Sequence, residues 1–541
     1  TVVRSCIPTS RSIRGALAFL AGIAGLSSNP VRAQGWSPDA GGGNYKNPII
    51  YADYSDPDAI RVGDDFYMTS SSFASVPGLP ILHSRDLVHW TLVNHAIRRL
   101  PQAFDVPQHG NGIWAPSIRF HDGAYYIYYG DPDRGIYMVK TRDVLGTWDG
   151  PVLVREAKGW IDPCPLWDDD GNAYLVHAFA NSRAGVKSIL HVNRMSADGT
   201  RLLDDGTLVF DGHANHPTIE GPKFYKRNGW YYIFAPAGGV PTGWQTVLRS
   251  KHALGPYEDR IVLAQGTSPT NGPHQGAWVE LKNGEHWFLH FQDRGAFGRI
   301  VHLQPMIWRP DGWPVIGRDS ASTGTGEPVL AHRLPTVVGA RNSNVPQTSD
   351  EFDARVLGQQ WQWEANDQPG WYSLTAAPGS LRLFAQPRRA DSSSLWFAPN
   401  VLMQKIPAPV FTLTTRVSLG KTGDETAGLV VLGMDYAALS LRRTGSIVEL
   451  VLARVVDAPS GAAESLVVPA TLSTESAYLR ASCDGLMIRF SYSVDGAAWI
   501  AVGDPFTPKA ARWVGAKLGL FATRPSSSPG SYADFDFFRI Q

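Results

Sequence analysis

The feature that most constrains the fold is a short stretch that recurs five times along the chain. "NGWYYIF" at residues 228–234 is echoed by "DDFYMTS", "DGAYYIY", "DGNAYLV" and "NGEHWFL". Each copy is a turn followed by a run of β-branched and aromatic residues, which is the pattern of a β-hairpin. The copies are separated by 48 to 58 residues, counted between their turn positions, which are Asp65, Gly123, Gly171, Gly229 and Gly284.

A second unit recurs between these copies, as "HSRDLVHW", "KTRDVLGTW", "NRMSADGT", "RSKHALGPY" and "WRPDGWP". Each period therefore holds about two hairpins, or four strands. Four strands repeated five times, with few helical patterns, predict an all-β protein built on a five-bladed β-propeller. An open array of β-sandwiches is an alternative, whereas the long period disfavours a β-helix.

The repeat also predicts which side chains converge. Counting nine residues back from each turn position reaches one residue per blade: Asp56, Trp114, Asp162, Glu220 and Gln275. Equivalent positions in successive blades surround one axis, so we expect these side chains at one mouth of a central channel. The three carboxylates precede Pro or Gly-Pro, in "SDPD", "IDPC" and "IEGP", which restricts the backbone there. The alternative is that they hold channel water or a structural ion.

Composition narrows the ligand and the location. Among 541 residues, Lys plus Arg and Asp plus Glu both number 49. The chain therefore lacks the excess of positive charge that a nucleic-acid or anionic membrane partner would require, and we expect neither partner.

The segment "RSIRGALAFLAGIAGLSSNPVRAQG" has a basic start, a short apolar run and small residues before a cleavage site after Ala33. We interpret residues 1–33 as a signal peptide and predict a secreted or periplasmic protein, free of the membrane once processed. A disordered tail or a short anchor is the alternative.

Two carboxylates across a pocket that takes a neutral ligand are the minimum for glycoside hydrolysis. One protonates the leaving oxygen, and the other activates water or attacks carbon. A third carboxylate nearby repels the charged form of the acid and so keeps it protonated. Three carboxylates thus permit three roles.

The stretches "YSDPDAIRVGDDFYMTSSSF", "IDPCPLWDDDG" and "HPTIEGPKFYKRNG" resemble, in that order, glycoside hydrolase family 43. This family contains five-bladed β-xylosidases and α-L-arabinofuranosidases that invert anomeric configuration. The resemblance covers residues 44–318. It implies that Asp56 is the general base, Glu220 the general acid, and Asp162 the group that orients the acid and tunes its protonation.

The resemblance also implies substrate-binding residues. Arg299 in "FGRIVHL" matches an arginine of the fifth blade, and Phe73 and Trp114 match aromatic walls around the terminal sugar; core packing is their alternative. Where many members place a His on the fifth inner strand, this chain has Gln275, with His274 beside it. That departure weakens the case for a central metal. We expect no required cofactor, while leaving open a structural calcium.

The propeller pattern stops at a small-residue linker, residues 319–348. From Ser349 to the end, alternating runs such as "FTLTTRVSL", "IVELVLARVV" and "YADFDFFRI" predict antiparallel strands in a β-sandwich. This region, residues 349–541, is similar to the concanavalin-like jelly roll that follows the propeller in larger β-xylosidases of the family. Two roles compete for it: independent sugar binding, or a wall that narrows the pocket. We favour the wall.

The sequence thus predicts an exported, inverting hydrolase that releases terminal xylose or arabinose from hemicellulose-derived oligosaccharides or polysaccharides. One rival is a retaining, fructan-active five-bladed enzyme, whose signature has Asn where Ser55 stands here. Another is a non-catalytic carbohydrate-binding propeller, which has no need of a proton donor. The choice between xylose and arabinose and the oligomeric state are not predicted.

Overall fold

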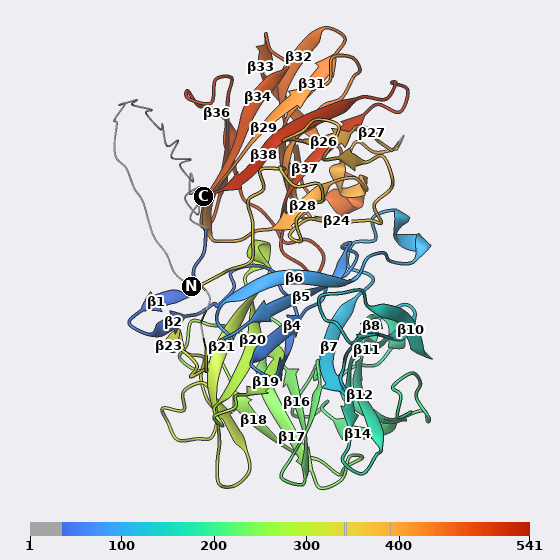
Figure 1. Ribbon diagram of the computed structural model, residues 1–541, viewed down its shortest axis with the longest axis vertical. Coiled ribbons are helices and arrows are strands. Elements are labelled where there is room, and N and C mark those ends of the chain that lie inside the picture. Colours follow the sequence, from blue (N-terminus) through green and yellow to red (C-terminus); the bar gives the residue numbers. More distant parts are fainter. Residues whose placement is uncertain (1–34, 340, 342, 390) are drawn as a thin grey trace, which may run out of the picture. The chain divides into compact units, whose positions relative to one another are not determined.

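The computed structural model describes residues 35–541 apart from residues 340, 342 and 390, and shows an all-β protein (Figure 1). The predicted signal peptide, residues 1–33, lies outside the described residues. No helix in the described part of the chain is long and apolar enough to cross a membrane. Helical elements there are short turns: η1 (Gln102–Asp105), α1 (Asn181–Ala184), η2 (Gly295–Phe297), η3 (Leu395–Phe397) and η4 (Ala458–Ser460).

Five four-stranded antiparallel sheets follow one another along the first part of the chain, and each contains one copy of the repeat. We number them sheets 1 to 5. Sheets 1 and 2 are β3 (Asp58–Val62), β4 (Asp65–Thr69), β5 (Gly78–Ser84) and β6 (Trp90–Ile97), then β7 (Trp114–His121), β8 (Ala124–Asp131), β9 (Gly135–Thr141) and β10 (Asp149–Glu156). Sheet 3 is β11 (Trp160–Trp167), β12 (Ala173–Phe179), β13 (Ile189–Met195) and β14 (Thr207–Asp211). Sheets 4 and 5 are β15 (Lys223–Arg227), β16 (Trp230–Ala237), β17 (Trp244–Ser250) and β18 (Glu258–Leu263), then β19 (His274–Glu280), β20 (His286–Asp293), β21 (Arg299–Trp308) and β22 (Pro314–Ile316).

Consecutive sheets pack face to face through apolar side chains. Leu79 and Ile81 of sheet 1 share a buried cluster with Ile118 and Ile127 of sheet 2. Similar clusters join sheets 2 and 3, 3 and 4, and 4 and 5. A further cluster joins Phe66 of sheet 1 to residues of sheet 5. Since strand residues alternate between two faces, each sheet can pack on two neighbours at once.

A small sheet lies beside these five. It consists of β1 (Asp39–Gly41), β2 (Asn44–Lys46) and β23 (Ala331–Arg333), in that order. β23 comes from residues 319–348, which the sequence predicts as a linker, and it pairs with β2 near the start of the described chain. The backbone of Ile49 and Ile50 then bonds to Val301 in sheet 5. Segments about 250 or more residues apart in sequence are thereby tied together.

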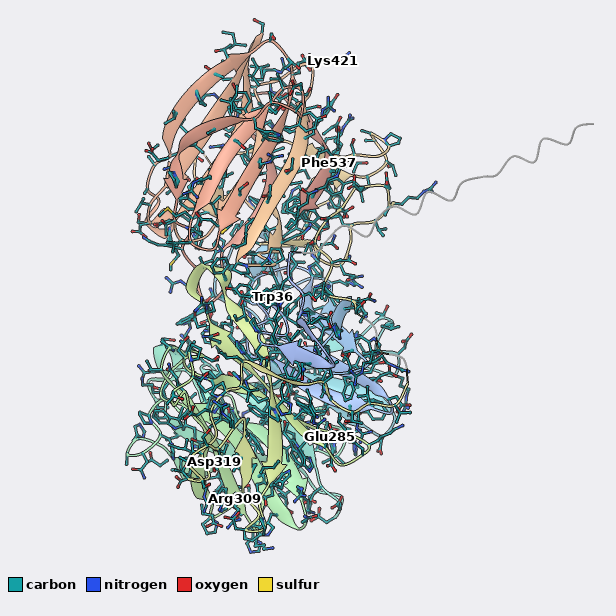
Figure 2. All side chains as sticks on the ribbon, turned by 90° about the vertical axis from the view of Figure 1, so that its left-hand side faces the viewer. Trp36, Glu285, Arg309, Asp319, Lys421 and Phe537 are labelled. Atoms are coloured by element: carbon teal, nitrogen blue, oxygen red, sulfur yellow. The ribbon has the colours of Figure 1, made fainter. Side chains whose placement is uncertain are left out.

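Residues 349–541, which we call the second region, form two larger sheets. One runs in the order β24 (Gln362–Trp363), β28 (Leu402–Lys405), β37 (Lys517–Arg524), β30 (Thr426–Leu432), β31 (Tyr436–Thr444), β32 (Ile447–Val455) and β33 (Ser465–Leu472), with β27 (Gln386–Pro387) also pairing with β37. The other runs in the order β25 (Tyr372–Ser373), β26 (Leu381–Phe384), β38 (Tyr532–Ile540), β29 (Val410–Leu419), β34 (Ser476–Asp484), β35 (Ile488–Ser493) and β36 (Ile500–Phe506). Figure 2 labels Lys421 and Phe537 in the second region, Glu285 and Arg309 in the part of the chain that forms sheets 1 to 5, and Asp319 just after it.

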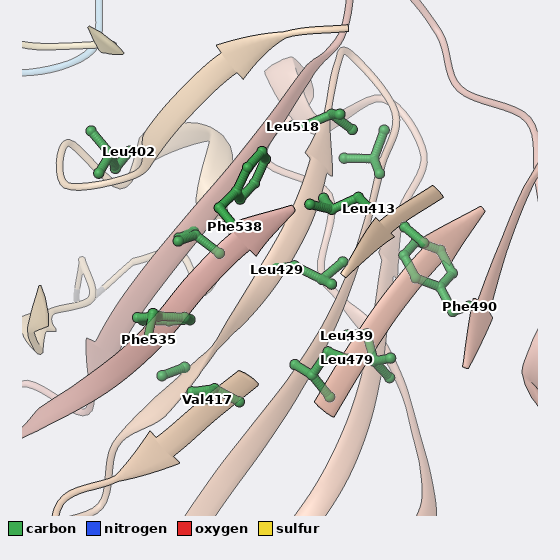
Figure 3. Packing of buried hydrophobic residues seen from close by; sticks show 14 of the residues in the cluster. Leu402, Leu413, Val417, Leu429, Leu439, Leu479, Phe490, Leu518, Phe535 and Phe538 are labelled. Carbon is green, nitrogen blue, oxygen red and sulfur yellow. The ribbon is translucent and has the colours of Figure 1, made fainter. Parts of the chain in front are cut away.

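The core of the second region lies between its two sheets (Figure 3). β29, "VFTLTTRVSL", buries every second side chain, among them Leu413 and Val417. These face Leu429 and Leu439 of the other sheet. Each fully buried Leu contributes about 1.5–3 kcal/mol of transfer free energy, so this strict alternation fixes the register of the strands. Cys164 and Cys483 are both free and buried.

Candidate active site

An unusual backbone conformation marks the entry to the first strand of all five sheets. Asp56, Ala115, Asp162, Gly221 and Gln275 all have φ between 33° and 57°. This left-handed region is unfavourable for residues that carry a Cβ, although Asp tolerates it better than most. The ladder is irregular at the same place in sheets 2, 3 and 5. The five positions are therefore structurally equivalent, and the surrounding fold holds each in place.

This equivalence refines the spacing read from the sequence. Asp56, Asp162 and Gln275 are the left-handed residues themselves, whereas Trp114 and Glu220 stand one residue before theirs. The hairpin turns also vary in length, with two residues after β15 and five after β11. Glu220 thus occupies a different backbone position from the two aspartates.

All three carboxylates line one cavity of about 140 Å³. Of the predicted substrate-binding residues, Phe73, Trp114, Gln275 and Arg299 also line it, while His274 lies behind and contacts Glu220. The sequence did not identify three other lining residues, which are Ile161, Val240 and Trp513. The cavity is completed by Ala115.

Asp56 is held by two partners. Arg299 Nη1 donates to both carboxylate oxygens, at 3.1 and 3.4 Å. Ser71 Oγ donates to Oδ2 at 2.5 Å and itself accepts from the Ala115 N–H at 2.7 Å. Ser71 thus joins sheet 1 to sheet 2 at the pocket. Two hydrogen-bond donors therefore fix the orientation of the Asp56 carboxylate.

Glu220 reaches further into the cavity. Its side chain is 26% exposed, and its Oε1 lies 3.1 Å from His274 Nε2. The next residue is glycine, and a Cβ at Gly221 would lie 2.5 Å from Gln275 Cδ, so the glycine lets the Gln275 side chain pack against this segment. Glu220 is therefore open to a ligand in the cavity, while the next residue of its chain packs against Gln275.

Asp162 is buried between the other two carboxylates. Its Oδ2 accepts the Gly221 N–H at 2.7 Å, so it is fixed to the residue that follows Glu220. Burial, and then the charge of Glu220, raise the pKa of Asp162 well above its ordinary value. The charge of Asp56 acts in the same direction more weakly, and buried Lys223 opposes it. The charge of Glu220 thus acts directly on the protonation of Asp162.

Aromatic rings form one side of the cavity. Phe73 and Trp114 meet edge to face with their centroids 6.2 Å apart. Trp114 meets Trp513 in the same way at 6.0 Å. Trp513 belongs to the second region and precedes β37. Trp513 as a residue is 49% exposed, which leaves an aromatic surface available for the apolar face of a sugar.

No group of three or more His, Cys, Asp or Glu side chains within the described part of the chain is arranged to hold a metal ion. His274 and Gln275 both have a buried nitrogen without a protein partner, namely Nδ1 and Nε2. These atoms are suited to bound water.

Comparisons with known proteins agree with this geometry. Residues 45–314 match the model of glycosyl hydrolases family 43, and residues 349–541 match the β-xylosidase C-terminal concanavalin A-like domain. A putative β-xylosidase of Xylanibacter ruminicola is 40% identical over 91% of this chain and 89% of its own length. The chain belongs to glycosyl hydrolase family 43. It is therefore a glycosidase, and it acts on oligosaccharides.

Other relatives of this family 43 glycosidase carry two kinds of name. A protein named β-xylosidase from Formosa agariphila is 32% identical, covering 92% of this chain and 90% of its own. A non-reducing end α-L-arabinofuranosidase of Bacteroides ovatus is 30% identical, covering 91% and 94%. The crystal structure of a xylan β-1,4-xylosidase from Bacillus halodurans has a TM-score of 0.80 at 26% identity, covering 92% of this chain and 99% of that structure.

Replacing Asp162 with Asn tests the coupling in this glycosidase. Burial and Glu220 raise the pKa of Asp162, so the pair keeps a proton to higher pH than an isolated carboxyl does. Asn is neutral and removes the repulsion that delays loss of the last proton. We expect the alkaline limb of the kcat/KM profile to move to lower pH while the acid limb stays in place. An unmoved alkaline limb would contradict the coupling.

Proposed function

We infer that this enzyme releases a terminal pentose, xylose or arabinose, from plant cell-wall oligosaccharides and inverts the anomeric configuration. The observation that carries this inference is the gathering of Asp56, Asp162 and Glu220 in one 140 Å³ cavity with aromatic walls. A cavity of that size suits one sugar ring at a chain end rather than the middle of a polymer. The names of the relatives, β-xylosidase and α-L-arabinofuranosidase, support the choice of sugar.

Asp56 is proposed as the general base. The Arg299 guanidinium and the Ser71 hydroxyl both donate to it, and a general base must accept a proton from the attacking water. Arg299 also borders the cavity and can donate to a sugar hydroxyl. The base therefore has its orientation set before substrate binds.

Glu220 is proposed as the general acid, and Asp162 as the residue that supports it. Glu220 is the most exposed of the three carboxylates, as a group that must meet the glycosidic oxygen requires. Asp162 accepts a hydrogen bond from the Gly221 N–H and so positions the chain beside Glu220, and its negative charge opposes the charged form of the acid. After bond cleavage, Asp56 returns to solvent the proton that it took from water and Glu220 takes one up, so that base and acid are both restored.

We also propose that sheets 1 to 5 form a closed five-bladed propeller. The support is that the apolar cluster between sheets 1 and 5 is of the same kind as those between consecutive sheets. Ile49 and Ile50, just before sheet 1, bond to Val301 in sheet 5, as a closure between the first and last blades requires.

The second region is proposed as a wall of the pocket rather than a separate sugar-binding module. Trp513 lines the cavity. The residues after it form hydrogen bonds with the part of the chain that contains sheets 1 to 5. Gly515 N–H donates to Asp53 Oδ2 at 2.9 Å, and Ala516 N–H donates to the Ala296 carbonyl at 2.8 Å. Lys517 contacts Ser75 at 2.7 Å and pairs with Glu364.

Trp513→Ala tests the wall. Loss of the ring should raise KM for short substrates about two- to tenfold, because an aromatic contact supplies about 0.5–1.5 kcal/mol beyond area burial. The matched control is Trp499→Ala, which removes a tryptophan of the same region that stacks on Arg480 instead. If Trp513→Ala weakens action on polymer and leaves short substrates unaffected, the region is a binding module.

Side-by-side assay of an aryl β-D-xylopyranoside and an aryl α-L-arabinofuranoside tests the proposed function. Turnover of either supports it, and the ratio of the two kcat/KM values assigns the preferred sugar. Turnover of neither, with hydrolysis of a fructan oligosaccharide instead, would favour the retaining rival. Export to the periplasm or medium and independence from added metal remain predictions, to be checked by fractionation and by activity after dialysis against a chelator.

A further inference from the structure

Asp53 is a buried carboxylate that does not line the cavity. Its residue is 4% exposed, and it lies three positions before Asp56. Oδ1 accepts the Ser55 hydroxyl at 2.9 Å and the Arg299 N–H at 2.9 Å. Oδ2 accepts the Gly515 N–H at 2.9 Å. One carboxylate therefore satisfies three donors from three separate segments.

Each donor adjoins a residue that shapes the pocket. Ser55 immediately precedes Asp56, and Arg299 is the partner of Asp56. Gly515 is two residues after Trp513 and 462 positions after Asp53 in the sequence. The segments that carry the proposed base, its arginine partner and the aromatic wall thus all bond to the Asp53 side chain.

The backbone next to Arg299 lies very close to the Asp53 side chain, at Gly298. A Cβ there would lie 2.5 Å from both Cβ and Cγ of Asp53, and the φ of Gly298 is +80°. Only glycine fits at this place. Lys405 lies close enough for its charge to act on Asp53, and burial lowers the pKa of this lysine to about 8. Three donors and a nearby cation thus surround Asp53.

We propose that Asp53 is a positioning residue that sets the catalytic base, Arg299 and the Trp513 wall in register with one another. This rests on the proposed function for the roles of Asp56 and Trp513 and goes beyond it by coupling the two regions of the chain. Asp53 touches no substrate itself. It acts through the backbone of Arg299, through Ser55 and through the segment that carries Trp513.

Asp53→Asn separates the two sides of this coupling. An amide has one acceptor oxygen, and placing it at Oδ1 keeps two of the three hydrogen bonds. The amide nitrogen then faces the Gly515 N–H, so donor meets donor and the Trp513 segment is released. We expect KM to rise about two- to tenfold, as for Trp513→Ala, with kcat within about twofold of the wild type. Asp53→Ala loses all three bonds, so kcat should fall about 10- to 100-fold as well, because the base is misplaced.

The experiment measures kcat and KM per folded enzyme for the full chain, together with hydrogen exchange of peptides covering residues 510–517. Asp86→Asn is the matched control. Asp86 is a fully buried carboxylate in the turn between β5 and β6, where it accepts the backbone N–H groups of Val88 and His89. Asp53→Asn should increase exchange in residues 510–517, and Asp86→Asn should lower stability without doing so.

A double-mutant cycle makes the result decisive. If Asp53 acts on binding through the Trp513 segment, Asp53→Asn should raise KM little further in the Trp513→Ala background. Additive effects would overturn the coupling. Wild-type kcat, KM and exchange in Asp53→Asn, with only a loss of stability like that of Asp86→Asn, would show a purely structural carboxylate. If Asp53→Ala does not fold, Asp53→Asn and the cycle still decide.

Failure of the proposed function gives a different result. An unmodified enzyme that hydrolyses neither aryl pentoside contradicts that function, while the exchange of residues 510–517 still reports whether Asp53 holds the segment. An active unmodified enzyme with unchanged exchange in Asp53→Asn contradicts this inference alone.

Discussion

Replacing Glu220 with Ala is expected to slow hydrolysis of substrates with poor leaving groups, such as xylo- or arabino-oligosaccharides, by about 10²- to 10⁴-fold. The reason is that the sugar alkoxide cannot depart without a proton. Aryl glycosides whose phenol is already acidic need little protonation, so their hydrolysis should fall much less. The measurement is kcat/KM against a series of leaving groups, which should become steeply dependent on leaving-group pKa in the variant.

The control for this prediction is Glu258→Ala. Glu258 is a carboxylate of the same sheet, on β18, where it pairs with Arg249 away from the cavity. Its loss should leave both substrate types unaffected. Equal losses for good and poor leaving groups in Glu220→Ala would instead mean that Glu220 holds substrate and does not deliver a proton.

Much of this site was visible in the sequence because its geometry is local. The repeat places one strand entry in each sheet, and counting from the turn reaches Asp56, Asp162 and Glu220, which the structure brings into one cavity. Alternation along strands such as β29 likewise predicts the sheets of the second region. Period-two burial and turn chemistry are properties of neighbouring residues, so a single sequence carries them.

The parts that the sequence could not supply depend on distant contacts. Trp513 belongs to no repeat, and only the fold brings it beside Trp114. Asp53 reads as one more polar residue before a strand until Gly515, 462 positions away, is seen to bond to it. A fixed spacing from the turn reaches Glu220, one residue before the left-handed position of its sheet, which is Gly221. The signal available in advance for Gly298 was only that a glycine stood next to Arg299.

Replacing Asp56 with Asn should be as damaging as the loss of Glu220 but with a different signature. A general base is needed whatever the leaving group, because water must lose a proton as it attacks in every case. We expect a fall of about 10²- to 10⁴-fold in kcat/KM for aryl glycosides and oligosaccharides alike. The two variants thus form an internal pair of controls: dependence on the leaving group should appear in Glu220→Ala and be absent in Asp56→Asn.

The stereochemical outcome decides whether Asp56 activates water or attacks carbon. Asp56 enters sheet 1 and Glu220 enters sheet 4, which are not consecutive, and the charge of Glu220 acts on Asp162 of sheet 3 more strongly than the charge of Asp56 does. The placement of Asp56 and Glu220 in non-consecutive sheets favours the wide separation of about 6.5–9.5 Å that leaves room for water, rather than the roughly 5–5.5 Å of a retaining pair. Proton NMR at the start of the reaction should therefore show the anomer opposite to that of the aryl glycoside before mutarotation. If the first sugar formed keeps the configuration of the substrate, Asp56 forms a glycosyl-enzyme bond, and its assignment as the base is wrong.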